Sequence, residues 1–172
     1  VIAPLEDCYK PSLVPETREL EKEHSEQIRL MASLGVDCLW IETMNTIREA
    51  RIAARFAQAT NLPFIVSFVA DANGDILSRE TFDKAVDALA PYKPDAILVN
   101  CSPLAHISRA IQKLRAVFQG RIGAYAAGLG SPTKDGGWRF PSCEEEAVLK
   151  YLSEVKQWFS LSPTIIGGCC GT

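Results

Sequence analysis

Three cysteines stand at the ends of two predicted strands, in the stretches LVNC (98–101) and IIGGCCGT (165–172). The carboxyl ends of parallel strands meet on one face of an α/β fold, so Cys101, Cys169 and Cys170 are expected to converge. Neighbouring strand residues point to opposite faces, but the flanking glycines allow the backbone to turn. Three thiolates at one point favour zinc, and three protein ligands leave its fourth position open, as in catalytic sites.

Other interpretations of the cysteines remain open at this point. Cys169 and Cys170 could form a disulfide with each other, or serve as small buried residues. Cys8, Cys38 and Cys143 are expected to be plain core or loop residues, with Cys38 inside a strand. A non-catalytic zinc site would need a fourth sulfur, which Cys8 or Cys143 would have to supply.

Other side chains with chemical potential lie near the same strand ends. Glu42 and Thr43 close the stretch VDCLWIET (36–43), and Asn100 immediately precedes a predicted metal ligand. Trp40 shares a strand face with Glu42 and is expected to fill the interior, where Glu42 could instead pair with an arginine. For Tyr125, in RIGAYAA (121–127), the sequence favours neither a substrate contact nor a packing role over the other.

The elements that must position these residues alternate between strand and helix. Short runs rich in Val, Ile and Leu predict strands at 1–5, 36–43, 62–69, 95–101, 121–127 and 163–169. Amphipathic helical segments separate them, which predicts a parallel sheet with helical crossovers. No G-x-G-x-x-G follows a strand, so a (β/α)8 barrel competes well with a doubly wound sheet. Six strands cannot close such a barrel, so about two βα units would be missing.

Local signals mark several helix and loop positions. Capping boxes are predicted at residues 46–49 and 142–145, where Thr46 and Ser142 precede a glutamate by three positions. His24 and His106 are expected at helix surfaces or caps. The segments 9–16 and 128–142 follow strands and would share the carboxyl-end face, where substrate loops belong.

Composition bounds the class of protein. The chain has 172 residues, of which 47% are hydrophobic and 23% charged, which suits one domain with a real core. A net charge of −3 gives no electrostatic case for nucleic acid or an anionic membrane as partner. No apolar run approaches the roughly 20 residues of a membrane span, and no signal-peptide pattern is present. Strand-like sequence begins at Val1, which suggests a piece of a longer protein, and the six cysteines are interpreted as thiols or ligands in a reducing cytoplasm.

Taken together, the motifs resemble the homocysteine S-methyltransferase family, which includes betaine–homocysteine methyltransferase and the homocysteine module of cobalamin-dependent methionine synthase. The similar stretches are IET (41–43), LVNC (98–101), IIGGCCGT (165–172), APLEDCYKPSLVPE (3–16) and EHSEQIRLMASLGVD (23–37). The resemblance runs through essentially all of the chain. It implies a single homocysteine-binding domain over residues 1–172. That domain would be an incomplete (β/α)8 TIM barrel comprising its third to eighth strands, without the first two βα units or the segment after the last strand.

The resemblance also assigns roles to individual residues. It implies three zinc ligands: Cys101, Cys169 and Cys170. Glu42 matches the acidic residue that holds the amino group of homocysteine. Beside this, Asn100 adjoins a ligand and could orient it, and Asn100 and Tyr125 are the further expected substrate contacts. Ala127 departs from the family, since many members carry an asparagine there.

The implied activity is zinc-dependent transfer of a methyl group to the thiolate of L-homocysteine, giving methionine. The donor could be S-methylmethionine, S-adenosylmethionine, betaine or methylfolate through cobalamin, and the sequence does not choose among them. The alternatives are methylation of another thiol or selenol such as selenocysteine, a non-catalytic zinc-binding domain, or a truncated inactive copy. The expected partners are small molecules, and a homo-oligomer remains compatible with the sequence.

Overall fold

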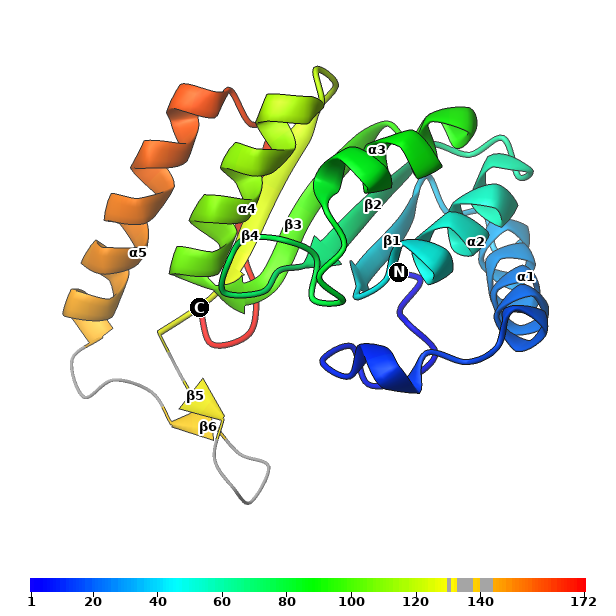
Figure 1. The fold of residues 1–172 in the computed structure, drawn as a ribbon, viewed down its shortest axis with the longest axis horizontal. Helices are drawn as coiled ribbons and strands as arrows, with labels where there is room; N and C mark the ends of the chain where they lie inside the picture. Colours follow the sequence, from blue (N-terminus) through cyan, green and yellow to red (C-terminus); the bar gives the residue numbers. More distant parts are fainter. Residues whose placement is uncertain (130, 133–137, 140–143) are drawn as a thin grey trace.

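The computed structural model describes residues 1–129, 131–132, 138–139 and 144–172. Cys143, the predicted cap at Ser142 and most of the predicted 128–142 loop therefore lie outside the described residues. Within that loop, the short strands β5 (Ser131–Pro132) and β6 (Trp138–Arg139) pair antiparallel. They follow the sheet strand β4 (Ile122–Ala127) beyond its carboxyl end (Figure 1).

A five-stranded parallel sheet forms the centre of the molecule, in the order β1-β2-β3-β4-β7 (Figure 1). Besides β4, its strands are β1 (Leu39–Met44), β2 (Phe64–Val69), β3 (Ala96–Pro103) and β7 (Ile165–Gly168). Five of the predicted strands are thus confirmed; all begin later than predicted, and β1 and β3 run past their predicted carboxyl ends. The predicted strand at 1–5 is reduced to a single parallel bridge between Ile2 and Ile41. Pro4 lacks the N–H that a longer ladder would need.

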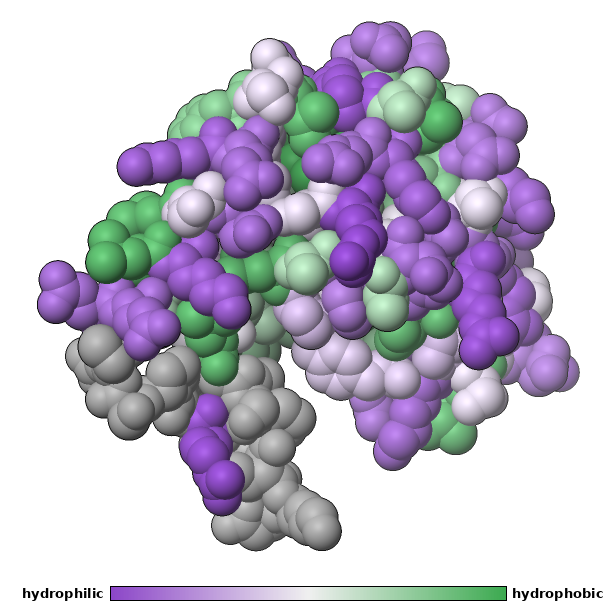
Figure 2. All heavy atoms as spheres, turned by 60° about the vertical axis from the view of Figure 1, so that its left-hand side comes forward, coloured by the Kyte–Doolittle hydropathy of each residue, from purple (hydrophilic) through white to green (hydrophobic). Residues whose placement is uncertain are grey.

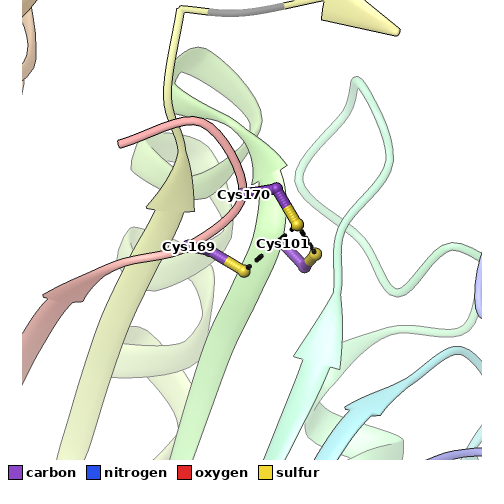
Figure 3. Close-up of side chains that lie close together, drawn as sticks. All are labelled: Cys101, Cys169 and Cys170. Carbon is purple, nitrogen blue, oxygen red and sulfur yellow. Dashed lines mark hydrogen bonds between the residues drawn. The ribbon is translucent and has the colours of Figure 1, made fainter. Parts of the chain in front are cut away.

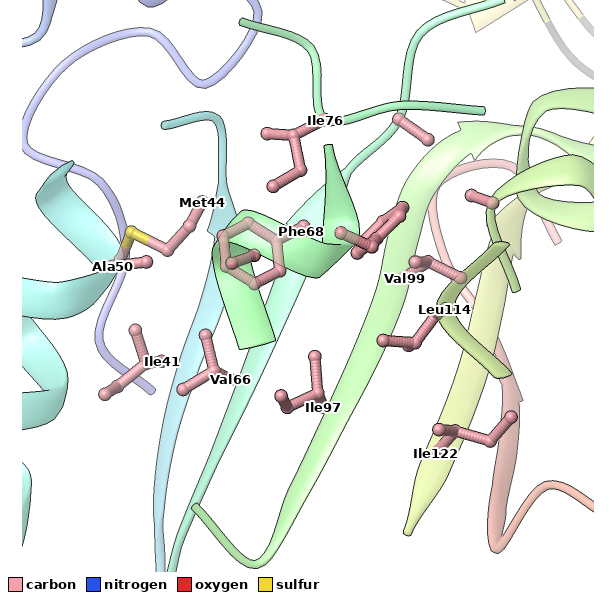
Figure 4. Close-up of a cluster of buried hydrophobic side chains, with 14 of the residues drawn as sticks. Ile41, Met44, Ala50, Val66, Phe68, Ile76, Ile97, Val99, Leu114 and Ile122 are labelled. Atoms are coloured by element: carbon pink, nitrogen blue, oxygen red, sulfur yellow. The ribbon is translucent and has the colours of Figure 1, made fainter. Parts of the chain in front are cut away.

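Helices pack against one face of this sheet (Figure 1). They are α1 (Thr17–Ser33), α2 (Ile47–Gln58), α3 (Phe82–Leu89), α4 (Leu104–Val117) and α5 (Glu144–Trp158), with 3₁₀ turns at Pro11–Leu13, Ala90–Tyr92 and Phe159–Leu161. Between sheet and helices lies the main apolar core, drawn in part in Figure 4, with side chains such as Val66, Phe68 and Leu114 fully buried. Among the described residues, no helix has both the length and the apolar character that crossing a membrane requires.

The last helix, α5, leaves much of its apolar surface uncovered. Trp158 is buried, but Val148, Leu149 and Leu152 are 55%, 60% and 47% exposed. Figure 2 shows apolar side chains on the side of the molecule where this helix lies. The helix is therefore packed on one side only within the described residues.

The opposite face of the sheet carries a second, smaller cluster. Leu98 and Tyr125 are buried there, and Trp40, Ile65 and Ile165 are half-buried against them. A doubly wound sheet would have helices on both faces, whereas a barrel wall has them outside only. The arrangement confirms the predicted α/β class and the incomplete (β/α)8 barrel.

Candidate metal centre

Two strand ends carry an unusual backbone conformation that positions side chains of the site. Cys101 in β3 has φ 51° and Thr43 in β1 has φ 64°, both in the left-handed region. The parallel pairing shifts register at both places, between Asn100 and Pro103 and between Ile41 and Met44. Such conformations are rare for residues with a Cβ, especially β-branched ones, and they concentrate at functional sites.

The sulfur atoms of Cys101, Cys169 and Cys170 form one compact group (Figure 3). All three lie within 4.8 Å of one another. The Sγ of Cys170 is 3.7 Å from that of Cys101 and 4.0 Å from that of Cys169. Three sulfurs bound tetrahedrally to one zinc at about 2.3 Å would stand about 3.8 Å apart. The donor set and its spacing therefore fit zinc, and the predicted convergence of these cysteines is confirmed.

The turn that carries the paired cysteines is fixed against the end of β4. Cys169 N donates to Ala126 O at 2.9 Å, and Gly128 N donates to Cys170 O at 2.8 Å. Gly171 has φ 74°, which completes the turn. A Cβ on Gly128 would overlap the carbonyl oxygen of Gly171, so only glycine fits there.

Ionisation of the three thiols is strongly linked. The pKa of Cys101 is lowered to about 6, mainly by a hydrogen bond from Cys169. Burial of this thiol raises its pKa, whereas hydrogen bonds from Tyr9 and Cys170 lower it further. The hydrogen bond to Cys101 raises the pKa of Cys169, and burial followed by the charge of Cys101 raises that of Cys170. The group thus carries one negative charge readily, and full ionisation calls for a cation among the sulfurs.

Tyr9, which sequence reasoning missed, reaches the same group from the loop before α1. Its hydroxyl lies 3.0 Å from Cys101 Sγ and 3.1 Å from Cys101 O. Burial and the hydrogen bond to Cys101 raise its pKa, so the hydroxyl keeps its proton at neutral pH. The neighbouring Cys8 is not in the three-sulfur group; burial and then the charge of Cys101 raise its pKa to about 11. The sequence placed this loop at the mouth, but no motif distinguishes one loop tyrosine.

Glu42 projects from the sheet face opposite the helices and is held by Tyr125. The Tyr125 hydroxyl donates to Glu42 Oε1 at 2.9 Å and accepts from Trp40 Nε1 at 3.0 Å. Ser67 Oγ lies 2.8 Å from the same hydroxyl and, since its proton goes to Glu42, acts as donor. Burial, followed by other contacts including the negative charge of Glu42, raises the pKa of Tyr125. Among the described residues, Glu42 makes no ion pair with an arginine.

Asn100 links the metal centre to the end of β1. It is fully buried, and its Nδ2 donates to Thr43 Oγ1 at 2.8 Å. Thr43 N in turn donates to Ser67 Oγ at 3.1 Å. These two contacts hold Thr43 in its left-handed backbone conformation. Asn100 Oδ1 has no hydrogen-bond partner within the described part of the chain. A buried amide oxygen in that state can still accept a hydrogen bond.

Three expectations outside the site need correction. Cys38 precedes β1 and is exposed, so it is not part of a strand. His24 is fully buried rather than at a surface, and its Nε2 lies 2.9 Å from Glu49 Oε1. Glu49 N donates to Thr46 Oγ1 at 3.3 Å, as in a capping box. The Glu49 carboxylate, however, binds His24 and Leu5 N instead of accepting from Thr46 N, as the second half of a capping box would require. The buried partners therefore take the carboxylate of Glu49 in place of the N–H of Thr46.

The chain is similar to known proteins in sequence and in fold. The family model for homocysteine S-methyltransferase matches residues 1–172. Homocysteine S-methyltransferase YbgG of Bacillus subtilis (strain 168) is 25% identical over 169 residues, which cover 95% of this chain and 52% of that protein.

Solved structures of the homocysteine methyltransferase MmuM from Escherichia coli are similar in fold. The metallated form matches with a TM-score of 0.74 at 22% identity, over 96% of this chain and 51% of that one. The oxidized form matches with a TM-score of 0.75 at 20% identity, with the same coverage. The chain thus spans about half the length of the relatives that it matches. With the family model matching from the first residue to the last, the chain belongs to the homocysteine S-methyltransferase family.

Proposed function

We propose that the protein transfers a methyl group to the sulfur of L-homocysteine, with zinc held by Cys101, Cys169 and Cys170. The observation that carries the proposal is the three-sulfur group, whose spacing suits zinc and leaves room for one more ligand. When bound, zinc would supply the positive charge that keeps a substrate thiol ionised at neutral pH. Family membership supports homocysteine as the substrate.

The chain's own residues would bind and orient the amino acid. Glu42 would accept hydrogen bonds from the substrate ammonium group, and Tyr125 would keep that carboxylate directed. Oδ1 of Asn100, which has no hydrogen-bond partner among the described residues, offers a further acceptor at the strand end. We treat residues 1–172 as a single homocysteine-binding domain, and the methyl donor is left open among the classes the family uses.

The thiols of the protein bear on the redox conditions in which it would work. Within the described part of the chain, the five cysteines form no disulfide: Cys8, Cys38, Cys101, Cys169 and Cys170. Thiols that bind a metal must stay reduced, which favours a reducing compartment such as the cytoplasm. Methylation of homocysteine would place the protein in methionine biosynthesis.

The deciding experiment is zinc-edge X-ray absorption on the full-length protein, with and without L-homocysteine. We expect three protein sulfurs around the metal and a fourth sulfur when the amino acid is added. Selenocysteine added in place of homocysteine would test the alternative substrate, since selenium scatters distinctly from sulfur. Four protein sulfurs that do not change on addition would instead mean a closed, non-catalytic site. Cys8, whose pKa is raised by burial and then by charges that include those of Cys101 and Cys170, is a candidate for the fourth sulfur.

A pair of alanine variants tests the ligand assignment. Cys170→Ala should lose both bound zinc and methyl transfer because it removes one of the three sulfurs. Cys38→Ala is the matched control, since this exposed cysteine precedes β1 at the other end of the strand. Equal zinc content and activity in the two variants would rule out the assignment.

A further inference from the structure

Tyr9 contacts the metal centre from a loop that no motif connects with it. Its hydroxyl lies 3.0 Å from Cys101 Sγ and 3.1 Å from Cys101 O, across 92 positions of sequence. We infer that Tyr9 is a positioning residue of the metal centre, whose hydroxyl donates a hydrogen bond to the Cys101 sulfur and so holds that sulfur in the direction that the metal needs. The inference rests on the metal site of the proposed function.

The direction of this hydrogen bond follows from counting protons. A phenol has one proton and two acceptors within reach here, the sulfur and the carbonyl oxygen of the same residue. While Cys101 is a thiol, its S–H can donate to Tyr9 and the Tyr9 hydroxyl can donate to the carbonyl. Once Cys101 is a thiolate, only Tyr9 has a proton, and a charged acceptor makes the stronger bond. The hydroxyl then donates to sulfur.

The position of Tyr9 is imposed by its own loop rather than by chance contact. Leu5 N donates to Glu49 Oε1 at 2.9 Å, and Glu49 is itself fully buried against His24. Asn45 Nδ2 donates to Asp7 O at 3.3 Å, and Tyr9 N donates to Asp7 Oδ1 at 2.9 Å.

The contacts of Leu5 and Asp7 fix the loop before Cys8, and the bond from Tyr9 N to Asp7 closes the turn around Cys8. The Tyr9 hydroxyl is thereby brought to Cys101 although half of the Tyr9 surface is exposed. The buried His24–Glu49 pair thereby gains a role in supporting the site as well as the fold.

A hydrogen bond to a metal-bound thiolate has two consequences. It holds the sulfur in the direction that the metal needs, beside a backbone already in the left-handed region at Cys101. It also withdraws electron density from that sulfur, so the metal keeps more of its positive charge for the substrate thiol. Loss of such outer contacts typically weakens metal binding by about 10- to 100-fold.

The test is Tyr9→Phe in the full-length protein, which removes the hydroxyl and keeps the ring. We expect zinc affinity, measured by competition with a chelator, to fall at least about tenfold. In the cobalt(II)-loaded protein, the sulfur-to-cobalt charge-transfer band should move to lower energy because Cys101 loses its hydrogen bond. The matched control is Tyr92→Phe, since the Tyr92 hydroxyl makes no hydrogen bond in the part of the chain that the structure describes.

The outcomes separate this inference from the proposed function. Unchanged affinity and an unshifted band in Tyr9→Phe, with metal bound normally in the wild type, overturn the inference alone. A lower melting temperature of the metal-free variant with an unshifted cobalt band means a structural role only and also overturns it. A wild-type protein that binds neither zinc nor cobalt overturns the proposed function and the inference with it.

Discussion

Hydroxyl groups of tyrosines direct the charged groups of this site. The Tyr125 hydroxyl makes three hydrogen bonds: it accepts from Trp40 and Ser67, and it donates its single proton to the Glu42 carboxylate. Because Tyr125 is buried, its orientation is set by packing before any substrate arrives. In the proposed function, the carboxylate would thereby be oriented in advance for the ammonium group of the substrate.

Replacing this hydroxyl should weaken substrate binding more than turnover. Tyr125→Phe leaves Glu42 free to rotate, and a hydrogen bond to a charged group contributes about 1.5–3 kcal/mol. We therefore expect KM for homocysteine to rise about tenfold or more, with a smaller change in kcat, in steady-state assays. Tyr92→Phe serves as control. An unchanged KM would mean that Glu42 does not hold the substrate through this contact.

At the scale of turns and helices, glycines allow the turn that carries Cys169 and Cys170 to pack closely against the sheet. The turn after β7 lies against the end of β4 through backbone hydrogen bonds at Ala126 and Gly128. The space beside Gly128 is filled by the backbone of Gly171, whereas a Cβ on Gly167 would meet only Tyr125 Cβ at 3.5 Å, an ordinary contact.

Two alanine variants exploit this difference. Gly128→Ala should push the turn away from β4 and lower zinc affinity by more than about tenfold, because two of the three sulfurs lie on that turn. Gly167→Ala, on the strand that leads into the turn, should bind zinc as the wild type does. Chelator competition measures both. If Gly128→Ala kept full affinity, docking of the turn would not define the site.

A buried histidine–glutamate contact and an exposed ion pair, both between α1 and α2, offer a second comparison at this scale. His24 and Glu49 are both 0% exposed and lie 2.9 Å apart. Glu21 and Arg55 lie equally close, but their side chains are 41% and 45% exposed. Glu49→Ala leaves buried His24 and Leu5 N without their hydrogen-bond partner and should cost about 1–3 kcal/mol in urea unfolding. Glu21→Ala should cost less than about 1 kcal/mol. Similar losses in both variants would contradict the role of burial.

For the molecule as a whole, the uncovered face of the sheet is the dominant feature. Helices cover one face, while the other presents half-buried Trp40, Ile65 and Ile165 around Tyr125. The β7 strand pairs only with β4 in the described residues, so its other edge is free. Exposed edges of parallel strands invite pairing with further chains.

The chain of residues 1–172 expressed alone should therefore self-associate. Sedimentation velocity at increasing concentration should show species larger than a monomer, and the full-length protein under the same conditions is the control. Partner molecules would cover the apolar face and the free edge, which lowers the free energy of the associated state. A monodisperse monomer that melts cooperatively would contradict this prediction.

Much of this architecture follows from the sequence. Runs of β-branched residues alternating with amphipathic segments predict a parallel sheet with helical crossovers, because each element must bury its apolar side. Parallel strands share one carboxyl end, so residue positions alone bring Cys101 to Cys169 and Cys170. The predicted donor set, its approximate location and the incomplete barrel needed no coordinates.

Tertiary structure decided the contacts that depend on side-chain direction across distant segments. Tyr9 reaches Cys101 across 92 positions, and Tyr125 reaches Glu42 across 83, and no periodicity encodes either contact. His24 has the sequence surroundings of a surface residue, yet a buried carboxylate draws it inside. Spacing along the chain determines which residues share an element and a face, whereas hydrogen-bond partners depend on how those faces pack together.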